Sequence, residues 1–384
     1  MSSPSARSAW IDNLRTAVIV LVVNMHACVT YSHVGDWYIM ENPEPPMTRK
    51  IFFLFWQGHL QAFFMGLLFF LAGVFAFRSL ERHGTGRFVR ERLFRLGLPA
   101  LFYMVLIHPF MVYVLLGVPK IPNRPSLGVR YVDYVTSLRV LRGSGPLWFA
   151  LALLMFCIAL AGWRSVSSKR EPRVRENSPA PKPAALLTFG CLLVMTTFAM
   201  RLFQPIGTNV LNFQLCFFPQ YIAVFIAGVA AERSGWLVEL AASRRARIAG
   251  WLGLVGGPVL LATVLALGGP PSEGGLSAYA GGWHGEAFGL AAWEQLAGLG
   301  LGLGMLAAFH ERVNRDGAIA RWLSDRAFGV YVLHAPILVA LTPLLRPLQG
   351  NHFVNVALLT LLGLIASYAA ADVVRRIPGL RAIL

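Results

Sequence analysis

Long apolar segments recur along the whole sequence and constrain its fold more than any other feature. Each has about 20 mostly apolar residues, enough for a helix to cross a hydrocarbon core of about 30 Å. Only helices or closed barrels satisfy the backbone in lipid, and these segments lack the alternation of barrel strands. The sequence thus predicts an all-α polytopic membrane protein, a bundle of about ten transmembrane helices with short loops. The ten spans are expected at residues 11–31, 52–77, 95–117, 146–163, 184–204, 212–231, 248–267, 286–309, 325–345 and 353–372.

The rest of the sequence is consistent with a single membrane-embedded domain over residues 1–384. No predicted loop exceeds about 30 residues, a length too short for a separate soluble domain. The first span contains Asp12, Arg15, Asn24 and His26 and is followed by no small-residue cleavage site, so we expect a retained helix rather than a signal peptide. The charged, proline-rich stretch at about 165–184 predicts a flexible cytoplasmic linker.

The formal net charge of +16 is explained by where the charges lie. Most of the 34 lysines and arginines fall in alternate loops, which places the N-terminus in the cytoplasm of a bacterial inner membrane by the positive-inside rule. The bilayer is therefore the expected surrounding, and nucleic acid is not an expected partner. The basic loop 118–145 is assigned to the outside, where it is either partly buried or in contact with an anionic substrate.

The four cysteines predict neither a disulfide framework nor a metal site. All fall within predicted spans, and none forms a Cys-x-x-Cys pair. They are expected to behave as small buried hydrophobic residues.

Ionisable residues within the spans are the best candidates for function, because they are costly in lipid. They are His26, His59, His108, Arg201, Glu294 and His334. Arg15 and His26 are eleven residues apart, about 16 Å along a helix and about 20° past three full turns, so they share a face. A free imidazole titrates near neutrality, so a histidine such as His26 suits proton transfer. Arg15 is either an anion-binding residue at the cytoplasmic edge or an anchor paired with Asp12.

A second basic feature is the segment RFVRERLFRLGLP at residues 87–99. Arg92 and Arg95 are three residues apart, which on an α-helix gives a shared face at the cytoplasmic end of the third span. Two guanidinium groups per turn suit a pyrophosphate or a phosphorylated ribose. An ordinary basic loop is the alternative.

Together these residues resemble the acyltransferase-3 family of membrane acyltransferases. The likeness rests on Arg15-x10-His26, on Arg92-x-x-Arg95, on FFLAGVFAF (69–77), on PLWFALALL (146–154) and on YVLHAPI (331–337) with His334. The C-terminal RRIPGLRAIL and the FQLCFFPQY stretch are most similar to the glucans biosynthesis protein C branch, whose members are linked to succinylation of periplasmic glucans. The chain departs from the family pattern at Ala72, Pro146 and Ala335.

The resemblance implies an O-acyltransferase with acyl-CoA, either acetyl-CoA or succinyl-CoA, as donor and an extracytoplasmic glycan as acceptor. It implies no metal. Arg15, Arg92 and Arg95 would gather the phosphates of the donor, and His26 would act as a general base or carry the acyl group transiently. His334 matches the family pattern in the ninth span, and with His26 and Glu294 it is a candidate catalytic residue.

Two further residues are given roles in the same framework. Glu294 would orient a histidine or a sugar. Arg201 is expected to be a snorkelling arginine at the membrane interface, with binding of a succinyl carboxylate as the alternative.

Two functions from other classes are also compatible with the composition. A proton-coupled secondary transporter would use the intramembrane histidines and Glu294 as a relay, but the two matching halves typical of transporters are not evident. A non-catalytic scaffold for glycan assembly is the third possibility.

Overall fold

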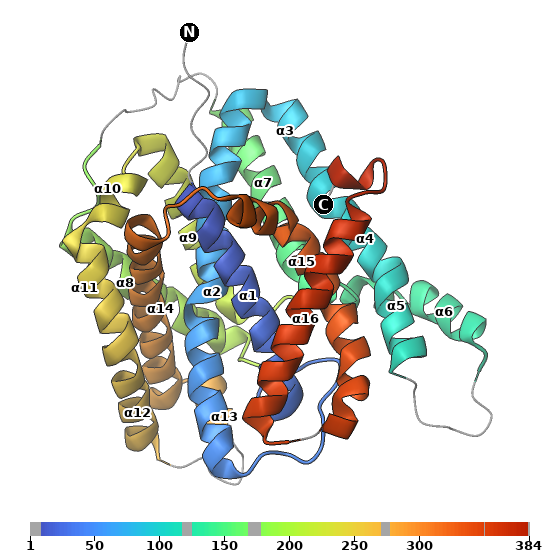
Figure 1. The fold of residues 1–384 in the computed structure, drawn as a ribbon. Coiled ribbons are helices and arrows are strands. Elements are labelled where there is room, and N and C mark those ends of the chain that lie inside the picture. Colours follow the sequence, from blue (N-terminus) through green and yellow to red (C-terminus); the bar gives the residue numbers. More distant parts are fainter. Residues whose placement is uncertain (1–8, 117–124, 168–177, 270–276, 349, 383–384) are drawn as a thin grey trace.

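The computed structural model describes residues 9–116, 125–167, 178–269, 277–348 and 350–382, and within them the regular elements are helices, with no β-strand. In the part of the chain that the structure describes, ten helical segments are long and apolar enough to cross a membrane, and they coincide with the ten predicted spans to within several residues except at the start of the third. The helices pack side by side into one bundle (Figure 1). The predicted all-α polytopic class is therefore confirmed.

The transmembrane helices are named in chain order as in Figure 1. They comprise α1 (Ala9–Ser32), α2 (Met47–His83), the segment Thr85–Leu115 that includes α3 (Thr85–Arg92), α4 (Leu98–Phe102) and α5 (His108–Phe110), α7 (Trp148–Val166), α8 (Pro183–Phe203), α9 (Phe218–Ser234), α11 (Arg244–Trp251) with α12 (Gly257–Gly268), α14 (Gly285–Arg312), α15 (Ala318–Leu345) and α16 (His352–Val374). Three short helices lie between them, α6 (Leu127–Thr136), α10 (Leu237–Ala242) and α13 (Ser277–Ala280).

The third span begins about ten residues earlier than the predicted boundary at residue 95. Helix α2 continues to His83, Gly84 ends it with φ of 71°, and α3 starts at Thr85. The Gly84 N–H donates to the carbonyl of Leu80 at 2.9 Å, a helix-ending bond that the positive φ of glycine permits. The expected basic loop 78–95 is therefore mostly helical, because a single glycine is enough to turn the chain.

Proline explains most of the π-helical turns that interrupt two of the spans. The stretches Leu93–Gly97, Tyr103–Ile107 and Leu252–Gly256 are each followed two residues later by proline, at Pro99, Pro109 and Pro258. A proline ring clashes with the carbonyl four residues earlier and removes an N–H donor, and a wider turn relieves that clash.

Part of the predicted linker at 165–184 is held in place. The N–H of Ala180 donates to Glu239 Oε2 at 3.0 Å, and Arg245 Nη1 donates to the carbonyl of Pro181 at 2.7 Å. Residues 168–177 of the predicted linker lie outside the described residues.

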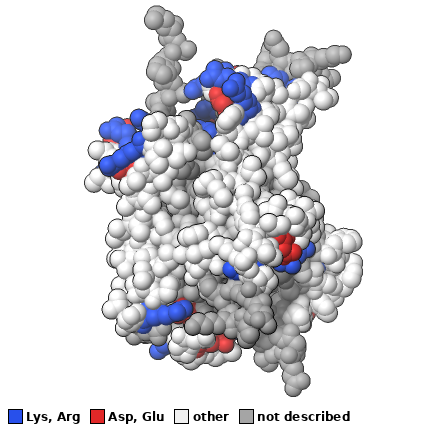
Figure 2. Space-filling model, turned by 90° about the vertical axis from the view of Figure 1, so that its right-hand side faces the viewer, with Lys and Arg blue, Asp and Glu red and all other residues white. Residues whose placement is uncertain are grey.

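Charged side chains mark the ends of the bundle. On the face drawn in Figure 2 the largest groups of Lys and Arg lie at the upper end, while the middle is mostly uncharged. The upper end contains the N-terminus of α1 and the C-terminus of α16 (Figure 1). We call it the basic end.

Helix α2 lies at the centre of the bundle and crosses α9 at very short range. A Cβ atom at Gly73 would lie 2.2 Å from the carbonyl oxygen of Phe225, and one at Gly228 would lie 2.0 Å from that of Phe70. The two glycines allow the backbones to touch, as is typical of small residues at membrane helix contacts.

We expect Gly73→Ala to destabilise the protein by about 1–3 kcal/mol, because the added methyl must push the α9 backbone away. The free energy of unfolding of the purified protein in mixed micelles measures this. Gly162→Ala in α7 is the matched control, since its Cβ would meet no atom within 4 Å. Equal stability of the two variants would contradict the close crossing.

Candidate active site

The structure brings two of the predicted catalytic residues together in the interior of the bundle. The rings of His26 in α1 and His334 in α15 are stacked, with centroids 5.2 Å apart and an interplanar angle of 18°. Trp37, from the connection between α1 and α2, stacks on His26 at 3.8 Å and 14°. The three rings are therefore nearly parallel, although they come from three separate parts of the chain.

The hydrogen bond of His334 fixes which of its nitrogens is basic. Its Nδ1 lies 2.7 Å from the carbonyl oxygen of Tyr331. A carbonyl oxygen only accepts, so Nδ1 carries the hydrogen, and in the neutral ring Nε2 has the lone pair. Nε2 is buried and has no hydrogen-bond partner among the described residues, which leaves it available to a substrate hydroxyl.

The other two rings also present buried nitrogens without a hydrogen-bond partner among the described residues, Nδ1 of His26 and Nε1 of Trp37. Buried polar atoms are normally satisfied, so such a group calls for a water molecule or a ligand. His26 is partly exposed whereas His334 is buried. Simultaneous protonation of both imidazoles is disfavoured, because two positive charges this close repel strongly in a medium of low dielectric constant.

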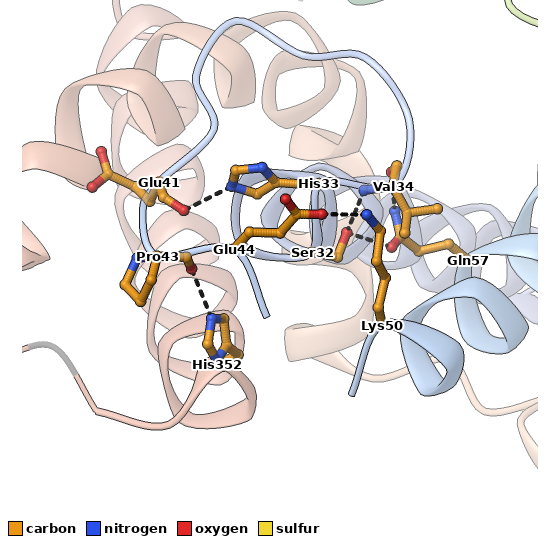
Figure 3. Close-up of polar contacts among 9 residues, drawn as sticks. All are labelled: Ser32, His33, Val34, Glu41, Pro43, Glu44, Lys50, Gln57 and His352. Atoms are coloured by element: carbon orange, nitrogen blue, oxygen red, sulfur yellow. Dashed lines mark hydrogen bonds and ion pairs between the residues drawn. The ribbon is translucent and has the colours of Figure 1, made fainter. Parts of the chain in front are cut away.

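Trp37 was not identified from the sequence, and it is placed by a well-bonded connection over residues 33–46. Gln57 in α2 bonds the start of this connection twice, as Figure 3 shows. Its Oε1 accepts from Ser32 Oγ at 2.8 Å, and its Nε2 donates to the carbonyl of Val34 at 2.9 Å.

The far part of the same connection is tied to the last two helices. Glu41, which is buried, accepts from Nη2 of Arg346 at 2.7 Å and from its Nε at 3.0 Å. His352 Nε2 lies 3.0 Å from the carbonyl oxygen of Pro43, and His33 Nε2 lies 2.9 Å from that of Glu41 (Figure 3). These contacts hold the connection in place and so position Trp37 against His26.

Tyr38, next to Trp37 in the chain, adds further polar contacts beside the stacked rings. The hydroxyl of Tyr38 lies 2.9 Å from His108 Nδ1 and 3.3 Å from the hydroxyl of Tyr103. Burial raises the pKa of Tyr38 to about 12, so its hydroxyl stays neutral at physiological pH. The only sequence signal for Trp37 and Tyr38 is two adjacent aromatic residues in the loop that follows the His26 span.

Arg15 lies on the same pair of helices as the stacked histidines, nearer the basic end. It pairs with Asp12 at 3.2 Å, and its Nη2 donates to Ser324 Oγ in α15 at 3.0 Å. Helices α1 and α15 run in the same direction (Figure 1), so Arg15 contacts α15 ten residues before the position that faces His26. The structure thus shows the predicted Asp12 pairing and also places Arg15 in line with the histidines.

Arg92 and Arg95 differ in their surroundings. Arg92 ends α3, lies over the ring of Phe88 at 5.1 Å and has a buried Nε without a hydrogen-bond partner among the described residues. Arg95 is exposed and falls in the π-helical stretch Leu93–Gly97. The two arginines thus occur one helical turn apart at the start of the third span, one half-buried and the other exposed.

Glu294 forms a buried ion pair instead of a hydrogen bond to a histidine. Its Oε2 accepts from Arg201 Nη2 at 2.6 Å, and its Oε1 accepts from Gln295 Nε2 at 2.9 Å. The side chain of Arg201 is 0% exposed, so the expectation of a snorkelling arginine is wrong. Snorkelling needs a free path to the interface, whereas this guanidinium is enclosed and lies over the ring of Phe217.

The sequence of the chain matches one known family. Residues 8–376 match the acyltransferase domain that defines the acyltransferase-3 family. The chain belongs to this family. The resemblance seen in the sequence motifs is therefore confirmed at the level of the family.

Curated relatives of this chain share about a quarter of its residues over the matched part. The glucans biosynthesis proteins C of Salmonella agona and Salmonella paratyphi A are each 25% identical to it over 237 residues, which cover 60% of this chain and 59% of the relative. That of Salmonella schwarzengrund is 26% identical over 186 residues, which cover 48% and 45%. The chain thus spans about three fifths or less of the length of these relatives. No solved structure matches it.

The buried pair gives a direct test of how the interior is organised. We expect Arg201→Met and Glu294→Met each to cost about 3–5 kcal/mol of stability, because each leaves an uncompensated charge in the bundle. The double variant should recover most of that loss, since both charges are then absent. Free energies of unfolding of the four proteins form the double-mutant cycle, and additive effects would show that the pair is not coupled.

Proposed function

We propose that this acyltransferase moves an acetyl or succinyl group from cytoplasmic acyl-CoA to a hydroxyl of an extracytoplasmic glycan, such as a periplasmic glucan. The observation that carries the proposal is the stack of His26 on His334 in the interior of the bundle, with ring nitrogens that have no partner among the described residues. The name of the Salmonella relatives, glucans biosynthesis protein C, supports a glucan as acceptor.

The proposed reaction needs a base that accepts the proton of the acceptor hydroxyl. His26 takes the proton of the acceptor hydroxyl as the oxygen attacks the thioester carbonyl. The C–O bond forms, the C–S bond breaks, and the leaving thiolate recovers the proton to give free CoA. His334, held by the Tyr331 carbonyl, keeps the His26 ring in register and offers its Nε2 to the acceptor.

The donor is proposed to reach the histidines from the basic end. Arg15, Arg92 and Arg95 lie toward that end and would bind the phosphates of acyl-CoA through charge-assisted hydrogen bonds. The excess of Lys and Arg in alternate loops supports a cytoplasmic basic end, with the N-terminus inside and the protein in the bacterial inner membrane.

We expect His26→Ala to abolish acylation while the protein remains in the membrane at the parental level, because the general base is lost. Mass spectrometry of cell-envelope glycans from a deletion strain carrying each variant measures this. His284→Ala, at an exposed histidine outside the stack, is the matched control and should keep the parental acyl mass. Acylation by His26→Ala at the parental rate would contradict the proposed role.

We expect Arg92→Gln to raise the KM for acyl-CoA about ten- to a hundredfold, because a hydrogen bond between charged groups is worth about 1.5–3 kcal/mol. Arg82→Gln removes the same charge from an exposed position at the same end and should leave KM unchanged. Initial rates of the purified enzyme with varied acyl-CoA separate KM from kcat. An equal change in both variants would show only a general loss of charge.

A further inference from the structure

A basic hollow lies between the beginning of α15 and the end of α16. It has a volume of about 750 Å³ and continues under the turn at Ile377–Gly379. Its charged lining consists of Asp325, Arg326, Asp372, Arg375, Arg376 and Arg381. We call it the C-terminal basin.

Positive charge is in excess in the C-terminal basin, since four arginines meet two aspartates. Asp372 already accepts from two of them, from Arg326 Nε at 2.7 Å and from Arg376 Nη2 at 2.7 Å. Arg381 is exposed and forms no ion pair with any described residue. Arg375 and Arg376 directly follow the last residue of α16, Val374, and so lie near its negative dipole end, whereas Arg381 lies further along the chain, where that effect has fallen off.

The rim of the basin has the character of a membrane interface. The guanidinium of Arg326 lies 4.4 Å over the ring of Trp322, and Trp322 stacks in turn on Tyr368. Tryptophan and tyrosine favour the level of the lipid headgroups. Next to them Val373 is 59% and Ile377 49% exposed, so apolar and positively charged surfaces adjoin.

The C-terminal basin is separate from the proposed donor path. Ser324, the α15 residue that binds Arg15, and Arg326 are two residues apart, which places them about 200° apart around the helix. Helix α15 therefore stands between Arg15 and the basin. Before it reaches the basin, α16 exposes apolar residues at four-residue intervals, among them Leu361 and Ile365.

We propose that the C-terminal basin binds the phosphate of an anionic phospholipid, whose acyl chains lie along the exposed face of α16. Four arginines supply the charge, the aromatic pair sets the depth, and the apolar face of α16 accepts the chains. Basic pockets between transmembrane helices are suited to anionic headgroups. This proposal does not depend on the identity of the donor or of the acceptor.

The test uses the full chain in nanodiscs of phosphatidylcholine, with and without phosphatidylglycerol or cardiolipin. Native mass spectrometry counts retained lipids, and thermal unfolding reports the shift in melting temperature that each lipid causes. The parent should retain an anionic lipid and be stabilised by it. The double variant Arg376→Gln/Arg381→Gln should bind it at least tenfold more weakly.

The double variant Arg312→Gln/Arg315→Gln is the matched control, since it removes two exposed charges elsewhere on the chain. It should behave as the parent does. Arg381→Gln alone breaks no ion pair with the described residues and can be tested if the basin double variant misfolds. It should also weaken retention of the lipid.

Two results would overturn the proposal. One is parental lipid binding by the basin variants. The other is a basin variant that keeps the lipid-induced shift but loses a shift caused by acyl-CoA in pure phosphatidylcholine, which would assign the basin to the phosphates of the donor.

Discussion

The hydrocarbon core offers no hydrogen-bond partner, so each polar group of this bundle must find one inside the protein or be kept for a ligand. Most do find one. Arg201 and Glu294 neutralise each other at 2.6 Å, and Gln220 donates to the carbonyl of Ala62 in α2 at 2.8 Å. His26, His334 and Trp37 are distinguished by position, because each has a buried ring nitrogen without a hydrogen-bond partner among the described residues and the three rings are stacked together.

The histidine stack depends on contacts made well away from it. Helix α2 supplies Gln57 to hold the connection that carries Trp37, and the ends of α15 and α16 hold the same connection through Arg346 and His352. The close crossing of α2 with α9 in turn fixes α2 in the bundle. The position of an aromatic ring over His26 is thus set by several helices together, as a preorganised site requires.

Arg15 and the histidine stack lie at different depths along α1 and α15. Arg15 contacts Ser324 of α15 near the basic end, and His26 stacks on His334 of the same helix further in. A long donor lying along α1 and α15 would therefore have its charged part and its reacting part at different depths. On the other side of α15 the C-terminal basin has its own arginines, so the charge of the basic end is divided between two faces of one helix.

The sequence by itself determined the helical class, the ten spans and the family, because apolar length and motif order are local properties of the chain. It also singled out His26 and His334, since an ionisable residue in an apolar span needs a reason to be there. Only the tertiary structure brought these two rings together, added Trp37 from a connection, and paired Arg201 with Glu294 across 93 residues. Helical spacing fixes which face a side chain occupies but not which other helix that face meets. That choice is made by packing between segments far apart in the chain, and no local pattern records it.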